Sequence, residues 1–345
     1  MALFLVTVPD AVAQSSKVSV QEQLREAQRN NDSLSAIHKD LQISEYRIKM
    51  EALKQEEEAE RIELILVSLF AVMAIIFMAF YANIRRLQLR KLKEAYDKLE
   101  ETTTAKERIE SELRIARDIQ MAMLPHDFPN YPGLDIYAVM IPAREVGGDL
   151  YDYVLINDML YFCVGDVSGK GIPASLLMAQ AVRLFRTLAN YEMNPADIAN
   201  AMNREFSKNN DNGMFITMFI GQLDLEDGML YFCNAGHNPP VLDGKFVKME
   251  PNAPIGLWLE MKFVEETIEY IGGQRLFIYS DGLNEAENQQ QEQFSDDRLK
   301  EWLGAHRGIE SSQLISDLLD EVESHVAGAD HSDDLTMFCL RYVPS

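Results

Sequence analysis

One long apolar segment interrupts a region whose pattern is otherwise polar and helical. Residues 64–84 carry no charged side chain. A helix of about 20 apolar residues is long enough to cross a hydrocarbon core of about 30 Å. The pattern therefore predicts a single transmembrane helix at residues 63–84.

The charges on the two sides of this segment differ in sign. Glu56 and Glu63 belong to an acidic stretch before it, whereas Arg85, Arg86 and Arg90 follow it. Because loops rich in lysine and arginine stay on the cytoplasmic side of a membrane, we expect the N-terminus outside and everything after residue 84 in the cytoplasm.

The residues before the apolar segment divide into two parts. Residues 17–62 have spaced apolar positions but no core of their own, which predicts an extracytoplasmic helical or coiled-coil arm. Residues 1–16 contain a short apolar run that ends in Ala11-Val12-Ala13 and resembles a signal-peptidase site, although no basic region precedes it. We interpret them as a signal peptide or an exported tail.

Residues 85–124 contain neither glycine nor proline and have a helical period. Apolar or small side chains repeat at four-three spacing, which is typical of a coiled-coil seam and predicts a homodimer through this linker helix. The seam consists of Leu92, Tyr96, Leu99, Thr103, Ile109, Leu113, Ala116, Gln120 and Met123. Between Thr103 and Ile109 the spacing is one residue short of a heptad. This slip is either a bistable joint that relays a signal from the membrane or a merely irregular linker, and the sequence leaves both open.

After residue 125, short runs of branched and aromatic residues alternate with turn signals. Asn157-Asp158, Asp227-Gly228, Asp243-Gly244 and Gly272-Gly273 predict four hairpins. The expected strands are residues 134–141, 151–156, 159–164, 214–225, 229–233, 240–242, 246–249, 263–270, 275–280 and 335–343, and the expected helices are residues 174–189, 195–206, 296–305 and 310–326. Repeated hairpins and helices paired at two points predict an α+β fold, a sandwich of two antiparallel sheets flanked by helices.

The first hairpin carries two aspartates that face each other. A tight turn at Asn157-Asp158 pairs Ile156 with Met159, and the same register places Asp149 opposite Asp166. Like charges at facing positions repel each other, so a divalent cation such as Mg²⁺ or Mn²⁺ between them would explain the pair. The alternative is a pair of solvated residues at the frayed end of a hairpin. Neighbouring glycines favour the metal because glycine in a strand often marks the close approach of backbone or ligand.

Net charge and cysteine placement argue against some classes of function. A formal net charge of −23 argues against nucleic acid, which is bound by clustered basic residues. Cys163, Cys233 and Cys339 each lie in an apolar run without metal-ligand spacing, which predicts reduced core residues. The segment 168–171 resembles a phosphate loop in its Gly-Lys-Gly part, but its spacing is wrong for that motif.

Two further acidic positions lie at strand ends. Asp281 follows the apolar strand 275–280, and Asp333-Asp334 precede the last strand. If the sheets bring these ends to the first hairpin, the carboxylates can hold two cations that share a water of lowered pKa, which makes attack on phosphorus feasible. No sequence motif for another hydrolytic chemistry competes.

The segments AREVGGDLYDY, GDVSGKGIPASLLM, NAGHNPP, YSDGLNEA and DDLTM, preceded by ELRIARDIQMAMLP, resemble the bacterial SpoIIE/RsbU-like branch of the PPM (PP2C-type) metal-dependent serine/threonine phosphatases. The resemblance covers residues 111–343. It implies an α-β-β-α sandwich at residues 125–345 and a regulatory helix within residues 85–124.

The resemblance also implies the ligands. Asp149, Asp166, Asp281, Asp333 and the backbone carbonyl of Val167 are expected to bind two or more Mn²⁺ or Mg²⁺ ions, with Asp166 as the bridging ligand. Asp149 and Asp166 then carry the catalysis together with a metal-bound water. Asp334 ranks below Asp333 and is an alternative or an outer ligand.

The sequence leaves two interpretations open for each of two further residues, His237 and Lys170. His237 either orients the substrate or is a hydrogen-bonded turn residue, and the turn is favoured. Lys170 either meets a phosphate or is a solvated loop lysine.

The expected function follows from these points. The chain is predicted to be a phosphoserine/phosphothreonine phosphatase anchored in the bacterial cytoplasmic membrane by a single span, with its catalytic domain in the cytoplasm. The resemblance implies a phosphorylated STAS-domain protein as the substrate. A non-catalytic scaffold that binds a STAS-type partner is the alternative, and a metal phosphodiesterase fits the ions but not the motifs.

Overall fold

The computed structural model of the chain describes residues 34–208, 210–329 and 332–344. The predicted signal peptide or tail at residues 1–16 and the start of the predicted arm lie outside the described residues. The chain divides into two units between Glu100 and Glu101, and each is described by itself.

The described part of the first unit is helical. Helix α2 (Leu34–Met121) begins there and ends in the second unit, and it remains helical through the threonines at residues 102–104. It contains a stretch that is long and apolar enough to cross a membrane, judged by length and composition. No other part of the described chain buries this stretch.

The second unit contains two five-stranded antiparallel sheets. In the first sheet the strand order is β1-β10-β9-β6-β7, and in the second it is β2-β3-β4-β5-β8. The strands are β1 (Leu134–Ile141), β2 (Leu150–Ile156), β3 (Met159–Val167), β4 (Ile216–Asp224), β5 (Leu230–Ala235), β6 (Val241–Leu242), β7 (Lys245–Phe246), β8 (Glu266–Ile268), β9 (Arg275–Tyr279) and β10 (Leu335–Tyr342).

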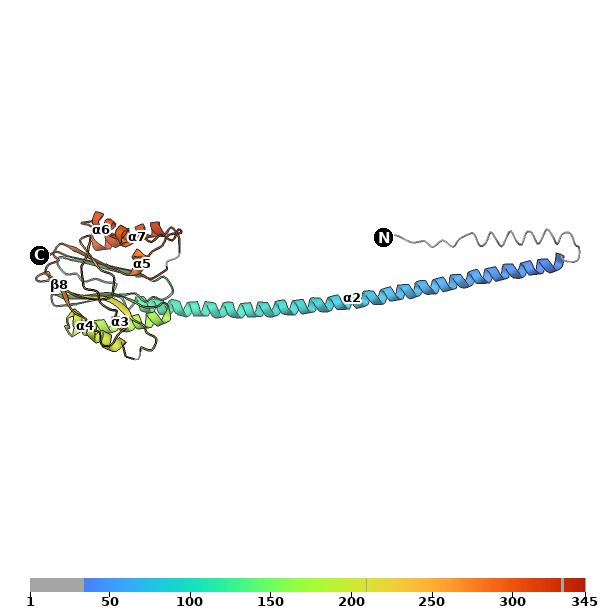
Figure 1. Cartoon of the computed structure of the whole chain (residues 1–345), viewed down its shortest axis with the longest axis horizontal. Helices are drawn as coiled ribbons and strands as arrows, with labels where there is room; N and C mark the ends of the chain where they lie inside the picture. The colour runs from blue at the N-terminus through green and yellow to red at the C-terminus, as the bar shows by residue number, and fades with distance from the viewer. Residues whose placement is uncertain (1–33, 209, 330–331, 345) are drawn as a thin grey trace. The chain divides into compact units, whose positions relative to one another are not determined.

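Helices cover the outer face of each sheet. Figure 1 shows α3 (Ile172–Asn190) and α4 (Pro195–Phe206) on one side and α6 (Asp296–Ala305) and α7 (Ser311–Val326) on the other. The sheets pack on each other through rings such as Phe162 and Phe338, whose centroids lie 5.3 Å apart. A separate apolar cluster fills the space beneath α6 and α7. The predicted α-β-β-α sandwich is therefore confirmed.

Local signals placed most elements correctly. Ile156 pairs with Met159, and the register continues to Leu150 opposite Gly165, as the turn residues predicted. Asn194 caps α4 by accepting a hydrogen bond from the backbone N–H of Asp197 at 2.8 Å. The three cysteines are buried and form no disulfide.

The fourth predicted hairpin is wrong. Strand β8 pairs with β5 in one sheet, whereas β9 pairs with β10 and β6 in the other. The glycine pair at residues 272–273 lies where the chain crosses between the sheets. The Ile271 N–H donates to the Gly228 carbonyl at 2.9 Å, and the Gly273 N–H donates to the Tyr342 carbonyl at 2.7 Å. These bonds fix the crossing to both sheets, and no local turn signal reveals them.

Candidate metal centre

The fold gathers the predicted acids from four strand ends. Asp149 directly precedes β2, Asp166 lies near the end of β3, and Asp281 begins the short helix α5 (Asp281–Asn284) after β9. Asp333 lies shortly before β10. They are close enough for the charges of Asp281 and Asp333 to act on Asp166.

Asp149 is the most buried of these acids. Its residue is only 1% exposed, and its Oδ2 atom has no hydrogen-bond partner among the described residues. Burial raises the pKa of its carboxyl group well above the usual range, and the nearby charge of Asp166 raises it further. The hydroxyls of Ser280 and Thr336 lower this pKa only in part, so a carboxylate here has less compensation than a buried charge needs.

Asp166 shows the same effect. Burial raises its pKa to about 7, and the charges of Asp281 and Asp333 add to the rise. Burial likewise raises the pKa of Asp281, followed by the charge of Asp333. Each acid therefore destabilises the ionised form of its neighbours, and a divalent cation would reverse this effect.

The described residues contain no group of three histidine, cysteine or acidic side chains in ready metal-binding geometry. The chemistry of the donors nevertheless fits a hard cation, because carboxylate oxygens predominate and one of them is buried without a partner. We therefore judge that the residues fit Mg²⁺ or Mn²⁺.

Asp333 and Asp334 have different surroundings. One oxygen of Asp334 accepts from the Ala143 N–H at 2.8 Å and the other from the Gly148 N–H at 2.6 Å. Asp333 forms an ion pair with Lys170 at 2.8 Å and keeps a partly exposed side chain. Asp334 thus fastens the loop before Asp149, which leaves Asp333 as the better candidate ligand.

Close backbone contacts explain the glycines around the acids. A Cβ atom on Gly148 would lie 2.9 Å from the carbonyl oxygen of Val167, so that carbonyl lies beside the residue preceding Asp149. A Cβ on Gly147 would lie 2.4 Å from Asp334 Oδ2, and one on Gly282 would lie 2.0 Å from the Asp334 carbonyl oxygen. The close approach expected at the glycines beside the facing aspartates is found at Gly147 and Gly148.

His237 has the environment of a turn residue. Its backbone N–H donates to Asn234 Oδ1 at 2.8 Å, and its carbonyl accepts from Asn234 Nδ2 at 2.9 Å. Its ring Nδ1 lies 3.1 Å from the hydroxyl of Thr217. Burial lowers the pKa of its imidazole to about 4. The ring Nε2 is buried without a hydrogen-bond partner among the described residues, so the two backbone bonds to Asn234 carry the structural interpretation.

Two polar contacts near the site were missed in the sequence. The buried side chain of Gln120, near the end of α2, forms two hydrogen bonds with the backbone of Gly147. Arg186 of α3 holds the fully buried Asp152 of β2 through two bonds of 2.9 and 2.8 Å. The only signal for the first was a glutamine at a seam position where an apolar residue is expected.

Comparisons with known proteins bear on the family and the fold of this domain. The family described as Stage II sporulation protein E (SpoIIE) matches residues 157–343. Protein IcfG of Synechocystis sp. is 29% identical over 261 residues, which cover 66% of this chain and 41% of that protein. Phosphoserine phosphatase RsbU of Bacillus subtilis is 26% identical over 252 residues, 72% of this chain and 75% of that protein. The SiaA-PP2C domain of Pseudomonas aeruginosa has 20% identity and a TM-score of 0.60, and the match covers 69% of this chain and 98% of that domain.

The fold and these matches define a PP2C-type serine/threonine phosphatase domain. The chain belongs to the SpoIIE family, in the branch that contains RsbU. It spans about two fifths of the length of IcfG.

Proposed function

We propose that the chain is a metal-dependent phosphoserine/phosphothreonine phosphatase. Asp149, Asp166, Asp281, Asp333 and the Val167 carbonyl would hold two or more Mn²⁺ or Mg²⁺ ions. Such ions, when bound, supply a water of lowered pKa for attack on phosphorus. The observation that carries the proposal is the buried pair Asp149 and Asp166, whose pKa values are raised by burial and by neighbouring carboxylates.

The chain's own residues would position this site. Asp334 fixes the backbone at Ala143 and Gly148, and the small glycines let the Val167 carbonyl and the carboxylates approach one another. Lys170 neutralises Asp333 through its ion pair. Because a lysine side chain is flexible, Lys170 could exchange this carboxylate for the phosphate of a substrate.

A phosphorylated protein of the STAS type is the proposed substrate. RsbU, a named phosphoserine phosphatase, is similar over most of its length. A further similar structure, 27% identical with a TM-score of 0.51, contains the RsbU and RsbW domains of Rv1364c from Mycobacterium tuberculosis. These names favour a protein substrate in bacterial signalling over a small phosphodiester.

We further propose that the enzyme is a dimer in the bacterial cytoplasmic membrane. The apolar part of α2 would form the single span, and the basic residues after it would keep the phosphatase domain in the cytoplasm. The exposed part of the seam, residues 92–116, would join two copies, and the end of α2 around Gln120, which is bonded to Gly147, would relay signals to the domain.

Phosphate release from a phosphorylated STAS-domain protein tests the activity. The full chain in detergent should release phosphate when Mn²⁺ is added. Asp166→Asn should lower the rate by more than about a hundredfold, since it removes a ligand oxygen, and should weaken Mn²⁺ binding measured by calorimetry. Glu226→Gln, which removes an exposed charge in the β4–β5 turn, should leave both unchanged.

The outcomes separate the candidates. Full activity of Asp166→Asn would exclude it as the bridging ligand. A wild-type chain that binds the STAS protein but never releases phosphate would be a scaffold instead.

A further inference from the structure

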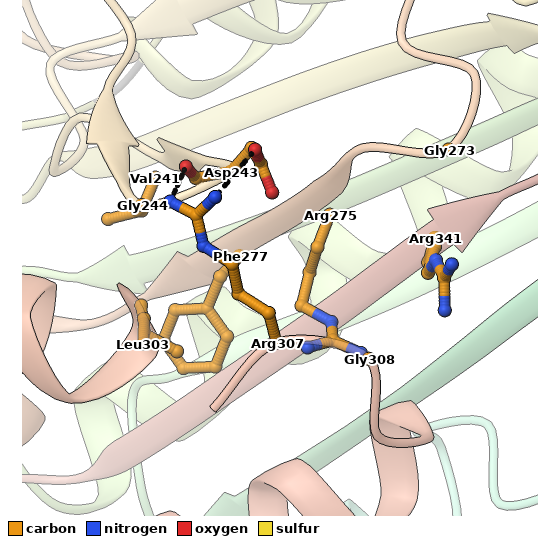
Figure 2. Close-up of a pocket in the computed structure, with 10 residues that line it drawn as sticks. All are labelled: Val241, Asp243, Gly244, Gly273, Arg275, Phe277, Leu303, Arg307, Gly308 and Arg341. Atoms are coloured by element: carbon orange, nitrogen blue, oxygen red, sulfur yellow. Dashed lines mark hydrogen bonds and ion pairs between the residues drawn. The ribbon is translucent and has the colours of Figure 1, made fainter. Parts of the chain in front are cut away.

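A second charged cavity lies away from the acids. It has a volume of about 290 Å³ and is bounded by the start of β9, the end of β10, the β6–β7 turn and the loop between α6 and α7. Figure 2 shows its lining residues, among which three arginines stand out: Arg275, Arg307 and Arg341. Such a concentration of positive charge is unexpected in a chain with a net charge of −23.

The strand register places two of these arginines side by side. Arg341 of β10 pairs directly with Arg275 of β9. Side chains at facing positions of neighbouring strands lie roughly 4.5 to 5.5 Å apart at Cβ, and like charges there destabilise the sheet. Phe277, two residues after Arg275, belongs to the cluster beneath α6 and α7, so this face of β9 is the face that the helices cover.

The nearest acid in the register offsets only part of this charge. Asp135 of β1 pairs with Arg341 on the other side of β10. Both oxygens of its carboxylate accept from the Ser311 N–H, at 2.9 and 3.2 Å, at the start of α7. No ion pair of Arg275 or Arg341 with a carboxylate is found among the described residues. Neither arginine of this pair is therefore held in an ion pair with a carboxylate in the described part of the chain, although Asp135 stands opposite Arg341 in the register.

Arg275 and Arg307 are hydrogen-bonded to the loops that border the cavity. Arg275 donates to the carbonyls of His306 and Ile309, and its buried Nε has no hydrogen-bond partner in the described chain. Arg307 holds the β6–β7 turn through Asp243, as the dashed lines in Figure 2 show. Three arginines and one aspartate therefore line the cavity, an excess of two positive charges among the lining residues. Asp135, opposite Arg341, reduces this excess but does not reverse it.

We propose that this cavity binds a small dianion that carries a phosphoryl group. A phosphate monoester has a charge of about −1.5 to −2 at pH 7, which is opposite in sign to the excess at the cavity. Guanidinium groups bind phosphate oxygens through paired, charge-assisted hydrogen bonds. Phe277 and Leu303 add an apolar wall for a small organic part. The volume lies at the small end of the range for ligand pockets, which suits inorganic phosphate or a small monoester.

The proposed anion site is separate from the metal centre. Arg275 begins β9, and Asp281 follows its other end six residues later. At about 3.3 Å per residue, this places the two about 20 Å apart. The anion site is consequently independent of the proposed hydrolysis.

Calorimetry on the full chain in detergent, with EDTA present, tests the site. Chelation removes the metal, so the acidic cluster repels anions and phosphate cannot bind there. The ligands are inorganic phosphate, adenosine monophosphate as a monoester, and acetate as a monoanion. Phosphate or the monoester should bind and raise the thermal midpoint of unfolding, whereas acetate should do neither. The ligand that binds more tightly shows whether the site prefers free phosphate or an organic monoester.

Arg341→Gln should weaken this binding about tenfold, the effect of losing one charge-assisted contact. It should change the ligand-free thermal midpoint little, because it relieves the repulsion with Arg275 and at the same time removes the attraction to Asp135. Arg341→Lys keeps the positive charge but loses the paired N–H donors of the guanidinium, so it should bind phosphate with intermediate affinity. Arg204→Gln, on the exposed face of α4, should bind like the wild type.

Three results would overturn the proposal. They are an absence of phosphate and monoester binding, equal binding by Arg341→Gln and the wild type, and acetate binding as tight as that of phosphate.

Discussion

The side chain of Gln120 and the backbone of Gly147 hold each other through two hydrogen bonds. Gln120 Nε2 donates to the Gly147 carbonyl at 2.7 Å, and the Gly147 N–H donates to Gln120 Oε1 at 3.1 Å. The glutamine is buried, and Gly147 lies two residues before Asp149. The end of α2 is thereby fixed to the backbone that leads into the proposed metal centre.

Gln120→Ala should therefore affect both stability and metal use. It leaves a buried N–H and a buried C=O without partners, which should cost about 1 to 3 kcal/mol. The Mn²⁺ concentration needed for half-maximal activity should rise, because Asp149 loses its support. Asp118→Ala, exposed two residues earlier on the same helix, is the matched control. An unchanged Mn²⁺ requirement in Gln120→Ala would contradict this coupling.

The sequence predicted contacts between residues close in the chain but missed contacts between distant residues. The β2–β3 register followed from Asn157-Asp158, because a two-residue turn fixes the pairing of the strands beside it. The hairpin at Gly272-Gly273 failed because the backbone around it bonds to Gly228 and Tyr342, which are distant in the chain. The contacts of Gln120 and Asp334 likewise depend on which loops the fold brings together. The spacing of residues in the sequence does not predict those loop contacts.

Gly282 should tolerate no side chain. A Cβ atom there would lie 2.0 Å from the carbonyl oxygen of Asp334, and a backbone atom cannot rotate away. Gly282→Ala should displace α5 and with it Asp281, so phosphate release should fall and the domain should be destabilised by about 1 to 3 kcal/mol.

The control for this change is Gly304→Ala in α6, where an added Cβ meets nothing within 4 Å. Alanine should stabilise that helix by up to about 1 kcal/mol. Chemical denaturation followed by tryptophan fluorescence measures both effects, since Trp258 and Trp302 are the two tryptophans of the chain and lie in the second unit. Equal stability of Gly282→Ala and the wild type would contradict this prediction, because it would show that the backbone at Asp334 can move away from residue 282.

The pair of Arg186 and Asp152 should be important for stability. Asp152 is fully buried, and Arg186 also donates to the Met123 carbonyl at 3.3 Å. Arg186→Met should cost about 3 to 5 kcal/mol, because it leaves a buried carboxylate without its partner. Replacing both residues with leucine should recover much of the loss, whereas Arg183→Met, exposed one turn earlier, should have little effect. If the single and double variants are equally destabilised, the lost packing of Arg186 matters more than its charge.

His237 should make the folded domain sensitive to acid. Burial lowers its pKa from 6.5 to about 4. Between these values the unfolded chain binds a proton that the folded chain does not, so this residue's contribution to stability is full above pH 6.5 and is lost as the pH falls toward 4. The shift corresponds to roughly 3 kcal/mol.

His237→Asn removes the titrating group while keeping the backbone bonds to Asn234. The free energy of unfolding should be measured for both chains at pH 7 and pH 4.5, and the advantage of the wild type should shrink by about 2 to 3 kcal/mol at the lower pH. Changes from the aspartates are common to both chains and cancel in this difference. His126→Asn, at an exposed position, should show no such change. Parallel pH profiles for the wild type and His237→Asn would mean that the imidazole titrates alike in the folded and unfolded chains.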